Sequence, residues 1–148
     1  MLFRSYVVDD FRRRGAIFVE DVAEVPPGAR IVFSAHGIAP AVVEAARARG
    51  LRIIDATCPL VTKVHLETKK AARDGFDVLL VGHEGHDEVE GTKGEAPERT
   101  RVVDSPEDVQ TLADGARPIF VVTQTTLSVD DTAATIGAIR ARRSEEHT

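Results

Sequence analysis

The chain has 148 residues, of which 43% are hydrophobic and 29% are charged, a composition typical of a soluble globular protein with one core of average size. Its formal net charge is −5, and Lys and Arg are not concentrated in basic clusters, so neither nucleic acid nor an anionic membrane is expected as a partner. No apolar run is long enough to cross a bilayer and no secretory signal pattern is found, so a cytoplasmic protein is expected.

The predicted strands are short runs rich in Val and Ile, separated by longer amphipathic stretches. They cover residues 16–20, 31–34, 52–55, 78–81, 101–103 and 119–123. This alternation is typical of βαβ units that carry a parallel sheet. The sequence therefore predicts an α/β fold.

The predicted helices fill the gaps between these strands. Residues 40–49 and 59–74 have helical periodicity and are each followed by a glycine, and the second places Leu60, Val61, Val64 and Ala71 on one face. Capping boxes at residues 105–108 and 128–131 predict two more helix starts. Segments 22–30 and 90–100, which contain glycine and proline, are expected to be loops.

Both ends of the chain resemble translated adapter DNA. Residues 143–148 (RSEEHT) correspond to the codons AGA TCG GAA GAG CAC ACG, and residues 1–5 (MLFRS) correspond to GTG CTC TTC CGA TCT read from a GTG start. Such segments are set aside before fold reasoning, which leaves residues 6–142 as the expected natural sequence. The nucleotide sequence decides this, because other synonymous codons at these positions would contradict an adapter origin.

Reactive side chains follow four of the predicted strands at their carboxyl ends. They are His36, Cys58, the His83 to Glu88 cluster and Thr125. In parallel sheets this edge binds ligands, because the following helices point their N-terminal N–H groups toward it. The sequence predicts that these residues meet at one sheet edge and bind an anionic ligand.

The only cysteine, Cys58, excludes an internal disulfide and has three possible roles: a buried apolar residue, a reactive thiol or a metal ligand. Because Pro59 favours the first helical position, Cys58 is expected at the helix N-cap, where a thiolate is stabilised.

The segment 82–88 (GHEGHDE) holds two imidazoles and three carboxylates. Its spacing differs from the HExxH zinc motif, which leaves two interpretations: a solvated acidic loop, or proton delivery by His86 with Glu88. His36 is a candidate phosphate ligand or an exposed loop residue, and Thr125 supplies a hydroxyl or belongs to a helix cap. His65, in the middle of a predicted helix, is expected at the surface.

Four stretches in order resemble one family, the LytB-type 4-hydroxy-3-methylbut-2-enyl diphosphate reductases. They are residues 31–37 (IVFSAHG), 55–65 (DATCPLVTKVH), 82–92 (GHEGHDEVEGT) and 123–132 (TQTTLSVDDT). The resemblance implies a three-domain α/β trefoil around a central [4Fe-4S] cluster. It also implies that residues 6–57 form the later part of the first domain, that residues 58–142 form nearly all of the second, and that the third is absent.

The same resemblance implies roles for individual residues. Cys58 matches the middle one of three cluster cysteines, His36 and His86 match substrate-binding histidines, Thr125 matches a residue near the substrate hydroxyl, and Glu88 matches the proton-donating acid. His83 has no implied role. The implied reaction takes two electrons, from a ferredoxin or flavodoxin type of donor protein, and converts the allylic diphosphate to isopentenyl and dimethylallyl diphosphates.

The departures from the family pattern predict an inactive product. The chain has one cysteine where the family uses three, and one thiolate cannot hold a cluster that needs several. An unstable or aggregating chain is also expected, because packing partners are missing. Two other classes remain: a hydrolase or transferase with Cys58 as nucleophile, and a non-catalytic anion-binding module.

Overall fold

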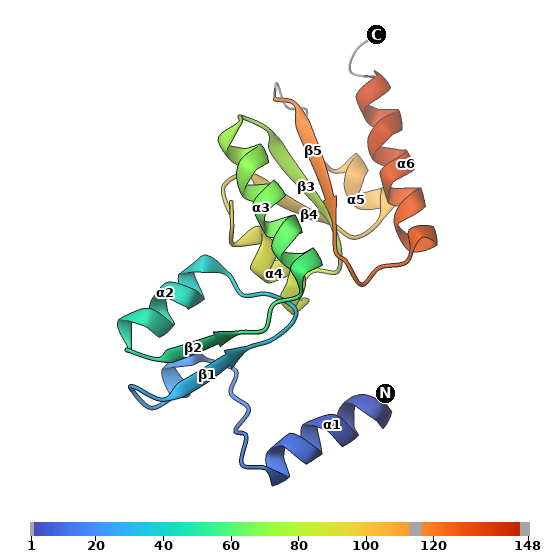
Figure 1. Ribbon diagram of the computed structural model, residues 1–148. Helices are drawn as coiled ribbons and strands as arrows, with labels where there is room; N and C mark the ends of the chain where they lie inside the picture. The colour runs from blue at the N-terminus through green and yellow to red at the C-terminus, as the bar shows by residue number, and fades with distance from the viewer. Residues whose placement is uncertain (1, 113–116, 146–148) are drawn as a thin grey trace.

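The structure is a computed structural model that describes residues 2–112 and 117–145, without the side chains of residues 2–5, 131 and 143–145. It contains two parallel sheets, each flanked by helices (Figure 1). Both sheets are built from strands that alternate with helices along the chain, so the protein has an α/β fold, as predicted.

The smaller sheet pairs β1 (Arg30–Phe33) with β2 (Arg52–Asp55) in parallel, with Arg30 opposite Arg52 and Phe33 opposite Asp55. Helix α2 (Pro40–Ala48) connects the two strands and packs on one face of the sheet, where Phe33 and Ala46 are buried. A short 3-10 helix, η1 (Val22–Glu24), contributes Val22 to this core, and α1 (Leu2–Arg13) precedes it.

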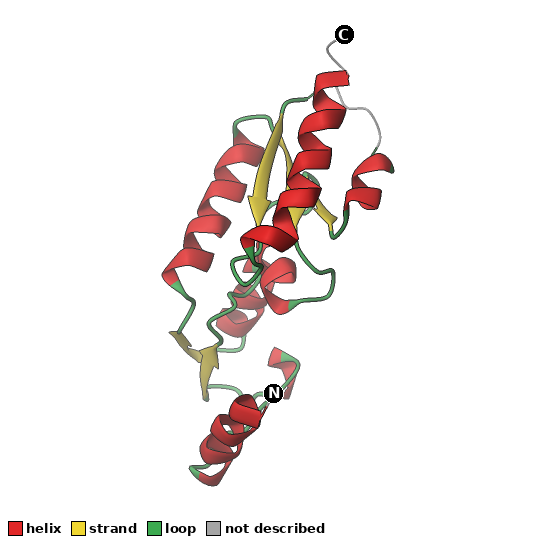
Figure 2. Cartoon of the chain, turned by 90° about the vertical axis from the view of Figure 1, so that its right-hand side faces the viewer, coloured by secondary structure: helices red, strands yellow, loops and turns green. Residues whose placement is uncertain are grey.

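The larger sheet has the strand order β4-β3-β5, all parallel, and helices lie on both of its faces (Figure 2). The strands are β3 (Asp77–Val81), β4 (Thr100–Val103) and β5 (Ile119–Thr123). Helices α3 (Pro59–Arg73) and α4 (Asp87–Lys93) cover one face, where Val78 and Leu80 are buried. Helices α5 (Pro106–Gln110) and α6 (Val129–Glu145) cover the other, where Leu79 and Val81 are buried.

Local signals explain where helices α2, α3 and α5 begin. Pro40 and Pro59 occupy the first helical positions of α2 and α3. The capping box that Ser105 and Asp108 form at α5 confirms the prediction for that helix. The second expected capping box involves Asp131, whose side chain lies outside the described residues.

Two predicted elements are wrong. Residues 16–20 form no strand, because Ile17 and Phe18 are both exposed and neither packs on a core, so period-two burial is missing. The expected loop over residues 90–100 instead begins as the second half of α4, which runs to Lys93. Three acidic residues in its first turn stabilise this helix through its dipole despite an internal glycine, Gly91.

The buried face of α3 also differs from the prediction. Val61 and Ala71 are buried as expected, but Leu60 is 63% exposed. His65, which was expected at the surface, is 8% exposed and is therefore a core residue. Within the described part of the chain, no helix is both long and apolar enough to cross a membrane.

Candidate functional site

The candidate site lies where the carboxyl ends of the two sheets face each other. His36 comes three residues after β1 and Cys58 three residues after β2, whereas His86, Glu88 and Thr125 follow β3 and β5. The predicted positions after the strands are therefore confirmed, but the single sheet edge is wrong, because these strands belong to two sheets. The chain leaves the first sheet at Asp55 and starts the second at Asp77, so long-range packing rather than strand pairing brings the loops together.

The rings of His36 and His86 are in contact across this junction. Their centroids are 5.4 Å apart and the rings are nearly perpendicular, at 79°. His36 belongs to the loop after β1 and His86 to the loop after β3, so each sheet contributes one imidazole. The two histidines that were predicted to bind substrate thus form one polar surface.

His86 also caps helix α4, and this contact fixes which nitrogen of the neutral His86 ring carries the hydrogen. The backbone N–H of Glu88 donates to Nδ1 of His86 across 3.2 Å. An accepting Nδ1 carries no hydrogen, so the ring proton of neutral His86 is on Nε2. His86 therefore offers an N–H donor to a bound oxygen atom.

Glu88 is almost completely buried, with 1% of its surface exposed. The backbone N–H of Thr125 donates to its Oε1 across 2.5 Å, which links α4 to the loop after β5. Its Oε2 has no hydrogen-bond partner among the described residues. A buried carboxyl oxygen without a partner is costly, so this atom is suited to form a hydrogen bond with a bound molecule.

Two candidate residues have looser surroundings. The Nδ1 atom of His36 lies 3.7 Å from Oδ2 of Asp87, which is too long for a hydrogen bond, and no other described atom bonds it. The Thr125 side chain is exposed, so its hydroxyl is open to a ligand while its backbone holds Glu88. His36 and Thr125 therefore border the site from opposite sheets.

Cys58 occupies the N-cap of α3, as predicted. Its side chain is half-buried and makes no capping hydrogen bond, and its backbone N–H donates to the carbonyl of Ala35 across 3.0 Å. This bond joins the Cys58 loop to the loop that carries His36. No histidine hydrogen-bonds Sγ of Cys58 among the described residues, so the nucleophile interpretation has no structural support.

The chain does not by itself contain a complete donor set for an iron–sulfur cluster. It has a single cysteine, and among the described residues no group of three or more His, Cys, Asp or Glu side chains is arranged to hold a metal ion. Because cluster iron is held by several thiolates, Cys58 can act as one ligand only. A cluster bound at Cys58 would need its other thiolate ligands from outside this sequence.

Sequence reasoning missed the role of Gln124, which is 4% exposed. Its Oε1 accepts from the backbone N–H of His83 across 3.1 Å, and its Nε2 donates to the Thr126 hydroxyl across 2.7 Å. Gln124 thereby ties the loop after β3 to the loop after β5. Its position directly after an apolar strand was the available signal, because a polar residue there is held by hydrogen bonds when it is buried.

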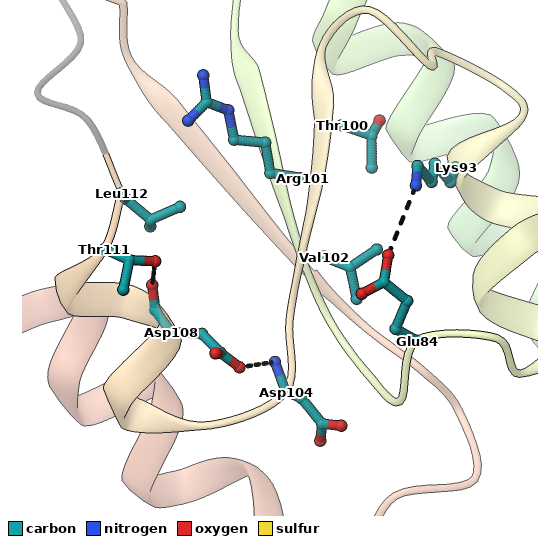
Figure 3. Close-up of a pocket in the computed structure, with 9 residues that line it drawn as sticks. All are labelled: Glu84, Lys93, Thr100, Arg101, Val102, Asp104, Asp108, Thr111 and Leu112. Atoms are coloured by element: carbon teal, nitrogen blue, oxygen red, sulfur yellow. Dashed lines mark hydrogen bonds and ion pairs between the residues drawn. The ribbon is translucent and has the colours of Figure 1, made fainter.

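The third loop histidine, His83, pairs with Asp104, which directly follows β4. Its Nδ1–H donates to Oδ1 of Asp104 across 2.7 Å. On this side a pocket of about 380 Å³ is bordered by Glu84, Lys93 and Asp108 (Figure 3). Backbone N–H groups of Asp104 and Ser105 donate to Asp108 and lower the pKa of that carboxyl. None of the five predicted site residues lines this pocket, so the pocket is separate from the candidate site.

Together these contacts define an α/β protein in which loops from two sheets bring two imidazoles and a buried carboxyl into one region. Known proteins that are similar to this chain agree with this class of protein and identify its family. The model of the family described as LytB protein matches residues 3–147. The chain belongs to the LytB family.

Several known proteins are similar to this chain in sequence or in structure. A 4-hydroxy-3-methylbut-2-enyl diphosphate reductase of Leifsonia xyli is 59% identical over 93% of this chain and 41% of that protein. The enzyme of the same name from Nocardia farcinica is 57% identical over 96% of this chain and 43% of that protein. The solved E-1-hydroxy-2-methyl-but-2-enyl-4-diphosphate reductase of Plasmodium falciparum is 41% identical, with a TM-score of 0.91, over 94% of this chain and 44% of that chain. The chain thus spans less than half the length of these relatives.

Proposed function

We propose that this chain is part of a reductase that converts (E)-4-hydroxy-3-methylbut-2-enyl diphosphate to isopentenyl and dimethylallyl diphosphates, the last step of the non-mevalonate isoprenoid pathway. The observation that carries this proposal is Glu88, a buried carboxyl with one oxygen held by a backbone N–H and the other without a partner among the described residues. The names of the relatives supply the substrate class.

The two histidines bind the diphosphate group in this proposal. His86 donates Nε2–H to a phosphate oxygen, because its Nδ1 is occupied by the backbone of Glu88. His36 contacts the same group from the other sheet, since its ring lies 5.4 Å from that of His86. Two donors on opposite sheets fix the position of the anion, and with it the position of the allylic hydroxyl.

Glu88 delivers the proton that leaves with the substrate hydroxyl. When Oε2 gives its proton to the departing oxygen, the C–O bond breaks and water is released, while the new charge on the carboxylate is stabilised by the N–H of Thr125 at Oε1. The allylic fragment that remains requires two electrons and a second proton to become either product. The exposed Thr125 hydroxyl hydrogen-bonds the substrate hydroxyl before this transfer.

The reduction needs parts that this chain lacks. The family's [4Fe-4S] cluster, with Cys58 as one of its three cysteine ligands, would supply the electrons to the substrate. A cytoplasmic ferredoxin or flavodoxin type of protein would donate electrons to the cluster. In this proposal residues 6–57 belong to the first domain of a trefoil and residues 58–142 to the second. With one cysteine, the 148-residue chain binds diphosphate but is inactive as a reductase.

Titration of the chain with inorganic pyrophosphate, followed by calorimetry, tests the binding part. His86→Phe and His36→Phe should each weaken binding at least about tenfold, because each removes one hydrogen bond to a charged group. Glu88→Gln should leave binding within about threefold, since Glu88 faces the hydroxyl end of the substrate rather than the diphosphate.

Two results would contradict the proposal. The first is unchanged pyrophosphate affinity in both histidine variants. The second concerns the inactivity of the chain: reductase turnover after anaerobic addition of iron and sulfide would show that Cys58 alone supports the reaction.

A further inference from the structure

Beneath the loop that carries His36 lies a buried histidine and carboxylate pair that the proposed function does not use. His65, in the middle of α3, and Glu95, just after α4, have side chains that are only 10% and 14% exposed. The Nδ1 of His65 lies 3.1 Å from Oε1 of Glu95. Because an ionised carboxylate only accepts, Nδ1–H donates, while Nε2 has no partner among the described residues.

Stability alone does not explain this pair. Replacing a buried polar or ionic pair by apolar residues of similar volume is often neutral or stabilising. The His65 ring lies beside the apolar residue Val61, one turn earlier on α3, since both would meet a Cβ built on Gly37. The contacts of this pair indicate another role.

The His65 ring packs against two glycines that approach each other closely. A Cβ built on Gly37 would lie 3.0 Å from Cε1 and Nε2 of His65 and 2.9 Å from Cγ1 of Val61. A Cβ built on Gly91 would lie 3.3 Å from Cε1 of His65 and from the carbonyl group of Gly37. Helix α4 thus rests directly on the Gly37 turn, and the ring of His65 fills the remaining space between them.

Each partner of this junction leads to a residue of the candidate site. Gly37 directly follows His36, and Gly91 belongs to α4, which begins after His86 and contains Glu88. Glu95 accepts from His65 just beyond the end of α4, so the ring is fixed to that helix. A shift of the ring changes the distance between the His36 loop and α4.

We propose that His65, held by Glu95, is a positioning residue that sets the spacing of His36 on one sheet relative to His86 and Glu88 on the other, and so determines the affinity for a diphosphate group. This inference rests on the proposed function for its ligand. The spacing itself can be measured without a ligand.

The test compares four variants of the whole chain. Glu95→Leu removes the acceptor for His65, whereas Glu95→Gln keeps an oxygen at the same place. Asp104→Leu is the matched control, because it breaks the His83–Asp104 pair at 2.7 Å without touching Gly37. Gly91→Ala keeps the His65–Glu95 pair and pushes α4 away from the Gly37 turn, so it tests spacing even where Glu95→Leu does not fold.

Two measurements are made on each variant: the dissociation constant for inorganic pyrophosphate, and the nuclear Overhauser effect between the His36 and His86 ring protons without ligand. Glu95→Leu and Gly91→Ala should weaken binding about 10- to 100-fold and reduce the ring-to-ring effect, because small misplacements of binding groups are costly. Glu95→Gln and Asp104→Leu should resemble the unaltered chain in both measurements.

The outcomes separate this inference from the proposed function. If the unaltered chain fails to bind pyrophosphate, the proposed function is wrong and the ring-to-ring effect alone decides the positioning role. If Glu95→Leu and Gly91→Ala both keep the His36–His86 contact, the positioning role is wrong whatever the affinity. Equal losses of affinity in Glu95→Leu and Asp104→Leu would overturn it as well.

Discussion

The two sheets of this chain are buried to very different degrees. In the larger sheet, four consecutive residues of β3 are buried and helices cover both faces. In the smaller sheet, α2 covers one face, while Val32 and Ile54 on the other face remain 63% and 52% exposed. Parallel sheets are normally covered on both faces. The larger sheet therefore has its own core, whereas the smaller sheet needs apolar contacts that the described residues do not supply.

The largest expected effect comes from the centre of the larger sheet. Leu80→Ala should lower the free energy of unfolding by about 2–5 kcal/mol, because Leu80 is 1% exposed and its removal leaves a cavity. Ile54→Ala in the smaller sheet should cost less than about 1 kcal/mol, since half of its surface is already exposed. Urea unfolding measures both, and similar losses would contradict the contrast between the sheets.

A glycine substitution at the junction should have the next largest effect. Gly37 and Gly50 both have positive φ, at 81° and 67°, but an added Cβ meets Val61 and His65 only at Gly37. Gly50→Ala should cost about 1–2 kcal/mol from backbone strain alone. Gly37→Ala should cost about 1–3 kcal/mol more because of overpacking. Equal losses in thermal or urea unfolding would show that the contact between the two sheets is loose.

Substitutions on the uncovered face of the smaller sheet should change the free energy of unfolding less. Replacing Val32 and Ile54 together by Thr should alter the free energy of unfolding by no more than about 0.5 kcal/mol, because both side chains already face solvent. The double variant should also self-associate less, as measured by sedimentation velocity. The matched control replaces Ile31 and Ile53, which pack toward α2, and should be clearly destabilising.

The smallest effect concerns acid stability at the end of β2. The hydroxyl and backbone N–H of Thr57 donate to Asp55 and, with the charge of His65, lower the pKa of that carboxyl from 3.8. A lowered folded-state pKa adds stability above the unfolded pKa that is lost as the pH falls through the folded value. Thr57→Val should therefore cost a few tenths of a kcal/mol, about the effect of an exposed pair, at neutral pH. The difference should disappear in unfolding experiments well below pH 3.8.

The contrast between the sheets also explains which sequence predictions are correct. Apolar runs and proline or serine at helix starts are local signals, and they correctly predict β3, β5, α3 and α5. They fail at residues 16–20, where the apolar pattern has no partner strand in the described residues. They fail again at Gly91, because the close approach of the distant Gly37 turn, which leaves little room for a side chain there, is not a local signal.

The positions of the candidate site residues along the fold were predictable, but their connections were not. The position of His36, Cys58, His86, Glu88 and Thr125 after strands follows from the alternation of strands and helices. The bond from Thr125 to Glu88 joins residues 37 positions apart, and the pairing of His65 with Glu95 spans 30. Both contacts join elements of the larger sheet that are far apart in the sequence, and no local pattern in one sequence encodes them.

The hydrogen bond from Thr125 to Glu88 uses the backbone rather than the side chain. Every amino acid except proline carries this N–H group. Replacement of Thr125 can therefore change how a ligand is contacted while leaving the anchor of the acid in place. The side chain at position 125, and with it the ligand preference, is free to change during evolution, provided that proline is avoided. The N–H group that holds Glu88 belongs to the main chain.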